Sequence, residues 1–96
     1  MGPMKTLLEV ISELDALDRE STIYASKPWA KDSTALVVQE PESGGLPLEA
    51  RDLGLDYFLE VFVASDFLED WIANLNAKPS AEQKCRRLIA YAVNDA

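Results

Sequence analysis

The chain contains no histidine and a single cysteine, which narrows the chemistry open to it. Histidine is the commonest general base and a common zinc ligand, so its absence excludes Ser–His and Cys–His nucleophiles and argues against a structural zinc site. Cys85 cannot form an internal disulfide, which favours a reducing compartment. We therefore expect a cytoplasmic protein without a cofactor, a metal or catalytic residues.

Long apolar runs are also absent. No segment approaches the ~20 apolar residues that a membrane helix needs, so we expect no membrane partner. The N-terminus lacks the basic-then-apolar order of a secretory signal. Met1–Pro3 look like an expression remnant ahead of a native start at Met4. With 96 residues, the sequence predicts a single α+β domain over residues 4–96.

Cations are scarce in the middle of the chain. The sequence has 17 acidic and 9 basic residues and a net charge of −8, and within residues 40–70 Arg51 is the only base. Nucleic acid is therefore a poor direct partner, because phosphates need a basic footprint. The acids either keep a small protein soluble or form a face that steers association with a basic protein.

Capping signals and apolar spacing predict the helices. Thr6 with Glu9 forms a capping box before an apolar stripe that ends near Asp18, and Ser80 with Gln83 precedes a helix over residues 81–93. Pro47 and Gly54 are expected to bound a short helix. A further helix is expected to start at Ser65 or Asp66, with Asp66 and Glu69 as its capping box.

Three segments are expected to be strands, namely residues 22–25, 35–39 and 56–63. The last is apolar on both faces, which favours a central position and leaves Glu60 either at a sheet margin or buried against Arg51 or Arg86. The element order is helix, strand, strand, short helix, strand, helix, helix. It predicts an α+β fold in which three main helices pack on a mainly antiparallel three-stranded sheet.

Trp29 is the first candidate contact residue, because it lies in a polar loop and tryptophan is enriched at interface hot spots. It could instead fold back over the core with its ring nitrogen bonded to a carbonyl. Glu40 and Glu42 flank Pro41 ahead of two glycines, where acids can hold cationic side chains of another protein or simply be solvated. Gly44–Gly45 is interpreted as a turn and not as a phosphate loop.

The remaining candidates extend the acidic face. Asp52, Asp56 and Asp70 complete it, although a helix dipole alone would explain acids near a helix start such as Asp66, Glu69 and Asp70. The apolar spacing points Cys85 inward as a small hydrophobic residue.

In size, acidity and its Glu40–Asp70 acidic stretch, the chain resembles small acidic bacterial immunity-type proteins and phage-encoded inhibitors. The resemblance covers composition and no specific motif. It implies a binding module that occludes a basic partner protein, such as a toxin or a nucleic-acid-handling enzyme. In this hypothesis the anchor is Trp29, and the complementary acids are Glu40, Glu42, Asp52, Asp56 and Asp70.

Two further hypotheses belong to other classes. A self-associating structural or regulatory protein would form a homodimer through Trp29, Phe58, Phe62 and an open sheet edge. An enzyme of unfamiliar type would use a pair of carboxylates, but no spacing in the sequence selects such a pair. We expect the protein not to be an enzyme.

Overall fold

The computed structural model describes residues 5–95 and has an α+β fold built on one antiparallel sheet. The predicted remnant Met1–Pro3 and the start at Met4 lie outside these residues. The sheet contains β1 (Lys5–Thr6), β2 (Thr22–Ala25), β3 (Thr34–Val38) and β4 (Asp56–Glu60), in the order β1-β3-β2-β4. The α+β class is confirmed, whereas the expected three strands are four. The two-residue β1 is too short to give an alternating pattern in the sequence.

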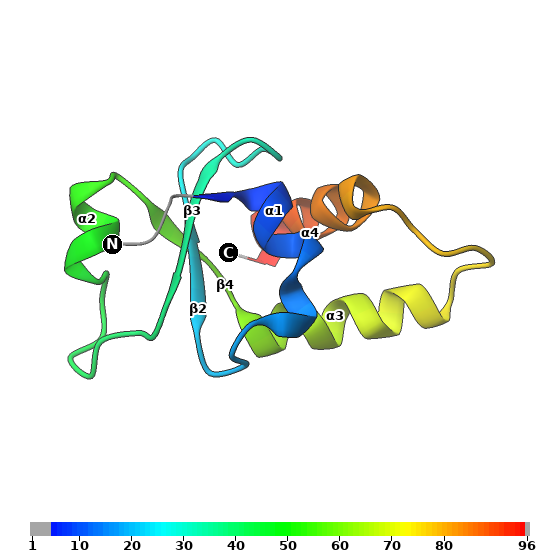
Figure 1. Ribbon diagram of the computed structural model, residues 1–96, viewed down its shortest axis with the longest axis horizontal. Helices are drawn as coiled ribbons and strands as arrows, with labels where there is room; N and C mark the ends of the chain where they lie inside the picture. Colours follow the sequence, from blue (N-terminus) through cyan, green and yellow to red (C-terminus); the bar gives the residue numbers. More distant parts are fainter. Residues whose placement is uncertain (1–4, 96) are drawn as a thin grey trace.

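The helices lie on the two sides of this sheet (Figure 1). One side carries α1 (Leu7–Ser12), a 3-10 turn (Leu14–Ala16), α3 (Val61–Ala73) and α4 (Ala81–Asp95). The other side carries only α2 (Leu48–Asp52), a helix of five residues. The sheet is therefore covered thoroughly on one face and thinly on the other.

Two apolar clusters correspond to these two faces. The large cluster joins sheet residues such as Ile23, Ala35 and Phe58 to α1, α3 and α4. The small one contains Tyr24, Ala50 and Leu55, with Leu36 and Val38 packed against it. Because side chains alternate along a strand, Ala35 and Val37 face the large cluster while Leu36 and Val38 face α2.

The predicted helix starts at Thr6 and Ser80 are confirmed. Thr6 and Glu9 bond each other's backbone and side chain as a full capping box, and Ser80 and Gln83 do the same ahead of α4. Pro47 and Gly54 also bound α2 as expected, with Gly54 at a φ of 70° that disfavours other residues. The first helix is shorter than predicted, because the α-helical turns end at Ser12 and a 3-10 turn follows.

The predicted strand over residues 56–63 is wrong in its second half. β4 ends at Glu60, and α3 begins at Val61, five residues before the predicted capping box at Asp66. Val61, Ala64 and Leu68 are all buried, and their spacing of three and four residues places them on one helical face. Packing of this face on the large cluster outweighs the β propensity of Val61, Phe62 and Val63.

A register shift in β4 explains why its strand appeared apolar on both faces. Ile23 pairs with Leu59 while Tyr24 pairs with Tyr57, so Phe58 is an extra residue in the ladder. Phe58 and Leu59 are consequently both buried in the large cluster. Glu60 lies half-buried at the end of the strand, and none of the ion pairs among the described residues joins it to Arg51 or Arg86.

Candidate functional site

Several exposed large apolar side chains lie together on the thinly covered side of the sheet, near one end of the molecule. We define the α2 end as residues 39–57, which comprise α2, the loop before it and the start of β4 (Figure 1). Leu48 is 68% exposed and Leu53 is 45% exposed. Leu46 and Tyr57 also expose more than a third of their surface. Exposed apolar side chains grouped in this way are typical of an interaction surface.

Acids alternate with these apolar side chains. The α2 end contains Glu40, Glu42, Glu49, Asp52 and Asp56, opposed only by Arg51. The ion pairs among residues 5–95 are Lys5–Glu13, Arg19–Asp66 and Lys31–Glu82. None of them involves an acid of the α2 end, so the negative charge there is not compensated within the described fold.

Glu40 lies close enough to the two tyrosines of this side to affect their ionisation. Burial is the main cause that raises the pKa of Tyr24, and the charge of Glu40 raises it further, while the Thr22 side chain partly offsets both. Burial likewise raises the pKa of Tyr57, followed by the charges of Glu60 and Glu40. The Tyr24 and Tyr57 rings meet edge to face with centroids 6.3 Å apart. The loop acid and the β2–β4 tyrosines therefore form one local environment.

Of the predicted contact residues, Glu40, Glu42, Asp52 and Asp56 belong to the α2 end, but Asp70 does not. Asp70 lies in the C-terminal half of α3, which is on the opposite side of the sheet (Figure 1). The acids at 66–70 were also expected in the first turn of a helix, and this was wrong because α3 starts at Val61. Asp66 instead forms an ion pair with Arg19 at 3.1 Å. The structure thus divides the predicted acidic face into two separate sets.

The contacts of Trp29 are likewise with the large cluster and not with the α2 end. Its ring packs on the large cluster, meets Phe58 edge to face at 4.9 Å between centroids, and donates its Nε1 hydrogen to the Ala25 carbonyl at 3.1 Å. This is the alternative arrangement, in which the indole covers the core. Its neighbours carry both charge signs. The Lys27 ammonium lies 5.1 Å from the ring centroid, and Lys31, Arg86 and Glu82 share a surface pocket with the ring, where Lys31 is paired with Glu82.

The aromatic set expected at a homodimer contact is likewise dispersed. Phe58 is only 2% exposed and cannot reach a partner, whereas Phe62 is 42% exposed. Among residues 5–95, β1 pairs with Thr34 and Ala35, and its first described residue, Lys5, lies opposite Ala35. The edge of β3 from Leu36 to Val38 has no neighbouring strand there.

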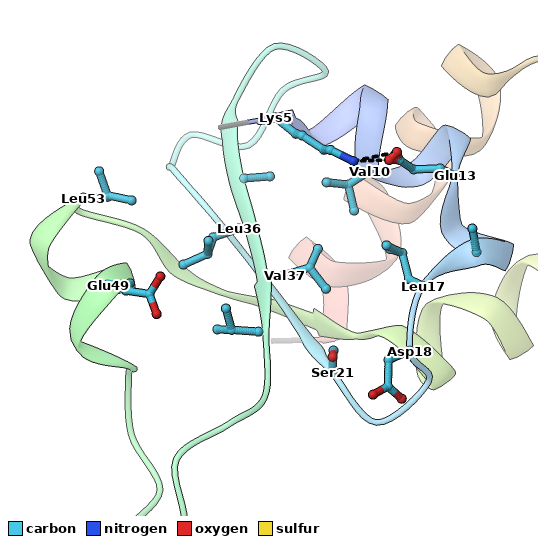
Figure 2. A pocket seen from close by; sticks show the side chains of 13 residues that line it. Lys5, Val10, Glu13, Leu17, Asp18, Ser21, Leu36, Val37, Glu49 and Leu53 are labelled. Atoms are coloured by element: carbon cyan, nitrogen blue, oxygen red, sulfur yellow. Dashed lines mark hydrogen bonds and ion pairs between the residues drawn. The ribbon is translucent and has the colours of Figure 1, made fainter. Parts of the chain in front are cut away.

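A groove of about 500 Å³ lies beside this part of β3 (Figure 2). Leu17, Val10 and Val37 line it on the side of the large cluster, and Leu36, Glu49 and Leu53 line it on the side of α2. Lys5 lies near one end and is paired with Glu13, and Asp18 lies toward the other end. The groove therefore has an apolar floor, and Asp18 and Glu49 at its rim form no ion pair among the described residues.

Cys85 is buried in the large cluster, as its position on the apolar stripe predicts. Burial raises the pKa of its thiol to about 11, with a further contribution from Glu82 that Lys31 partly offsets. A thiol of this kind is protonated at neutral pH and is a poor nucleophile.

Within residues 5–95, no group of three or more acidic, cysteine or histidine side chains could hold a metal ion. No helix in that range has the length and apolar character to cross a membrane. The chain matches no protein-family model, no curated protein and no solved structure.

The exposed leucines of the α2 end were not predicted from the sequence as contact residues. A signal for them exists, because a helix of five residues can bury only one of its sides. Ala50 is buried, and Leu48, two residues away, points about 200° around the helix and must face solvent.

Proposed function

We propose that this protein is a binding module whose α2 end contacts a basic partner protein. The observation that carries the proposal is the combination of exposed leucines and unpaired acids on the thinly covered face of the sheet. Apolar side chains at the centre of a contact contribute affinity, while charges around them steer the approach and select the partner. This arrangement suits an immunity-type or inhibitor role in which a cationic surface of the partner is occluded.

The proposed contact set differs from the one expected from the sequence. Glu40, Glu42, Asp52 and Asp56 are retained, and Leu48 and Leu53 replace Trp29 as apolar anchors. Trp29 already packs its ring on Phe58 and bonds its ring nitrogen. Little of its binding capacity is left for a partner, and Lys27 over its ring carries the same charge sign as a basic protein.

Salt dependence of the association rate tests this proposal. The partner is captured at low ionic strength from lysate of the source cell, and its binding to the immobilised protein is followed at increasing salt. The association rate should fall steeply up to about 0.15 M, because the Debye length shortens to about 8 Å. An association rate that does not change over this range would show that the acids do not steer the partner.

Homodimerisation is the second candidate, and the side of β3 from Leu36 to Val38, beside which none of residues 5–95 forms a strand, favours it. Pairing two copies along this edge would bring Asp18 and Glu49 of each copy together without an added cation, so charge disfavours it. Light scattering over a dilution series separates the two functions, since a monomer at all concentrations removes the homodimer.

A further inference from the structure

A surface pocket lies between α3 and α4, on the opposite side of the sheet from α2 (Figure 1). Its volume is about 340 Å³. It is lined by Trp71 of α3 and by Gln83, Arg86, Arg87 and Ala90 of α4, and we call it the α3–α4 pocket. The α4 residues are three and four positions apart, so they belong to one face of that helix. Pockets of about 300 Å³ and more are typical of small-molecule sites.

The polar side chains of the α3–α4 pocket offer donors rather than acceptors. The Gln83 side-chain oxygen already accepts from the Ser80 amide at 2.8 Å, which leaves its NH₂ group without a partner in the described fold. Arg86 and Arg87 are exposed and form no ion pair or hydrogen bond among residues 5–95. The Trp71 ring nitrogen likewise has no hydrogen bond within that range. Two guanidinium groups and two further N–H donors match a ligand that carries negative charge.

Arg87 is held in place by an aromatic ring and not by an acid. Its guanidinium carbon lies 5.0 Å from the Phe67 ring centroid, and Phe67 stacks on Tyr91 with 4.2 Å between centroids. A guanidinium group packed over a ring keeps its N–H donors at its edge, where they can bond two oxygens of one carboxylate or phosphate. Arg87 therefore loses less freedom on binding an anion than an unsupported side chain would.

The acids nearest to the pocket in sequence do not neutralise its arginines. Glu82 is paired with Lys31 at 3.1 Å. Asp70 of α3 forms no ion pair in the described part of the chain. No acid occurs in α4 between Gln83 and Asn94. The pocket is thus a locally positive site in a strongly acidic protein.

Size and charge limit what could occupy the pocket. Its α4 wall from Gln83 to Ala90 covers about 10 Å of helix at about 1.5 Å per residue. An extended peptide could place only about three residues along this length. The net charge of −8 would repel a long polyanion such as a nucleic acid, whereas a small anion meets mainly the local positive charge. Trp71 is half-buried on the large cluster and provides an aromatic wall for a planar ring.

We propose that the α3–α4 pocket binds a small organic anion, in which a phosphate or carboxylate group is attached to a planar ring. Arg86 and Arg87 bond the anionic group, and the ring packs beside Trp71. This inference goes beyond the proposed function, because it uses no residue of the α2 end. Either proposal can therefore fail without the other.

The test is an NMR titration of the full-length protein at low salt with adenosine monophosphate. The chain has two tryptophans, so their indole N–H groups give two signals. The Trp71 signal should shift, whereas the Trp29 signal should not, because that N–H is bonded to the Ala25 carbonyl. Adenosine and inorganic phosphate represent the two halves of the probe, and each should bind about tenfold more weakly or worse. Benzoate in a parallel titration distinguishes a carboxylate ligand from a phosphate ligand.

Two variants provide a matched comparison. Arg87→Gln removes one guanidinium group from the pocket and should weaken binding of adenosine monophosphate about tenfold. Lys84→Gln removes the same charge from the same helix outside the pocket and should bind within about twofold of the unaltered protein. Arg86→Gln is a second pocket variant with the same expected loss, should Arg87→Gln not fold.

Four results would overturn the proposal. The first is a Trp71 signal that neither adenosine monophosphate nor benzoate shifts at millimolar concentration. The second is equal affinity for inorganic phosphate and adenosine monophosphate, or equal losses in Lys84→Gln and Arg87→Gln, which would leave only general attraction of anions. A Trp71 signal that shifts with protein concentration in the absence of a probe would assign the pocket to a second copy. Tighter binding of a capped glutamate peptide than of either probe would assign it to an acidic protein.

Discussion

Individual side chains that look functional in the sequence are often used by the core. The sequence draws attention to Trp29 as an interface residue and to Cys85 as the single thiol. Both side chains pack on the large cluster. The inward position of Cys85 follows from helical spacing. The sequence left two positions open for Trp29, and only the structure decides for the one over the core, because a loop has no periodicity and the carbonyl that receives its ring hydrogen belongs to β2.

Cys85 leads to a prediction about alkaline pH. The folded pKa of its thiol is about 11 and the ordinary value is 9.0, so the unfolded chain loses this proton first as the pH rises. The stability linked to the neutral thiol is complete below pH 9 and is lost as the pH rises toward 11, by about 2 kcal/mol. Urea unfolding from pH 8 to 11 should give a steeper loss for the unaltered protein than for Cys85→Ala. Equal slopes would contradict a buried neutral thiol.

Tyr24 leads to a second prediction at this scale. Its side chain is 1% exposed, and among the described residues its hydroxyl is the one buried side-chain polar atom without a hydrogen bond of normal geometry, although the Thr22 side chain lies near enough to lower its pKa. An unsatisfied buried hydroxyl lowers stability, so Tyr24→Phe should raise the free energy of unfolding by about 1 kcal/mol. Tyr57→Phe is the matched control, because Tyr57 is 44% exposed and loss of its hydroxyl should change stability by less than about 0.5 kcal/mol. A loss of stability in Tyr24→Phe would show that the hydroxyl is bonded.

At the scale of elements, local signals predicted helix starts well where the chain caps itself. Thr6 and Ser80 begin their helices as capping boxes because the bonds that stabilise them lie within four residues. The start of α3 was missed because it has no such cap, and tertiary packing of Val61 fixes it instead. The β4 bulge and the two-residue β1 depend on partners far away in sequence, which no local pattern records.

The uncapped start of α3 gives a prediction of its own. Glu60 is the N-cap residue and its side chain makes no capping hydrogen bond. Serine has a side-chain oxygen that can accept from the backbone of the first turn, so Glu60→Ser should stabilise the protein by about 1 kcal/mol relative to Glu60→Ala. Thermal or urea unfolding of the two variants measures this difference. No difference between them would mean that another group satisfies these N–H groups.

At the scale of the whole molecule, the fold redistributes charge that is contiguous in sequence. The molecule is 42 Å long, and α2 and the C-terminal half of α3 lie toward opposite ends (Figure 1). Acids of the 40–70 stretch are therefore separated into the α2 end and α3. The sequence predicted an acidic face, but the division depends on α2 and α3 packing on opposite sides of the sheet. Among residues 5–95, only the α2 end combines several exposed leucines with acids that form no ion pair.

The most direct test of a binding role for the α2 end compares two double variants in capture from source-cell lysate. Leu48→Ser/Asp52→Asn alters the α2 end, and Leu75→Ser/Asp70→Asn makes the same chemical change at an exposed leucine and acid at the other end. The proposed function predicts that the unaltered protein and the Leu75 variant retain the same basic partner while the Leu48 variant loses it. Capture of that partner by the Leu48 variant, or its loss only in the Leu75 variant, would contradict a partner surface at the α2 end.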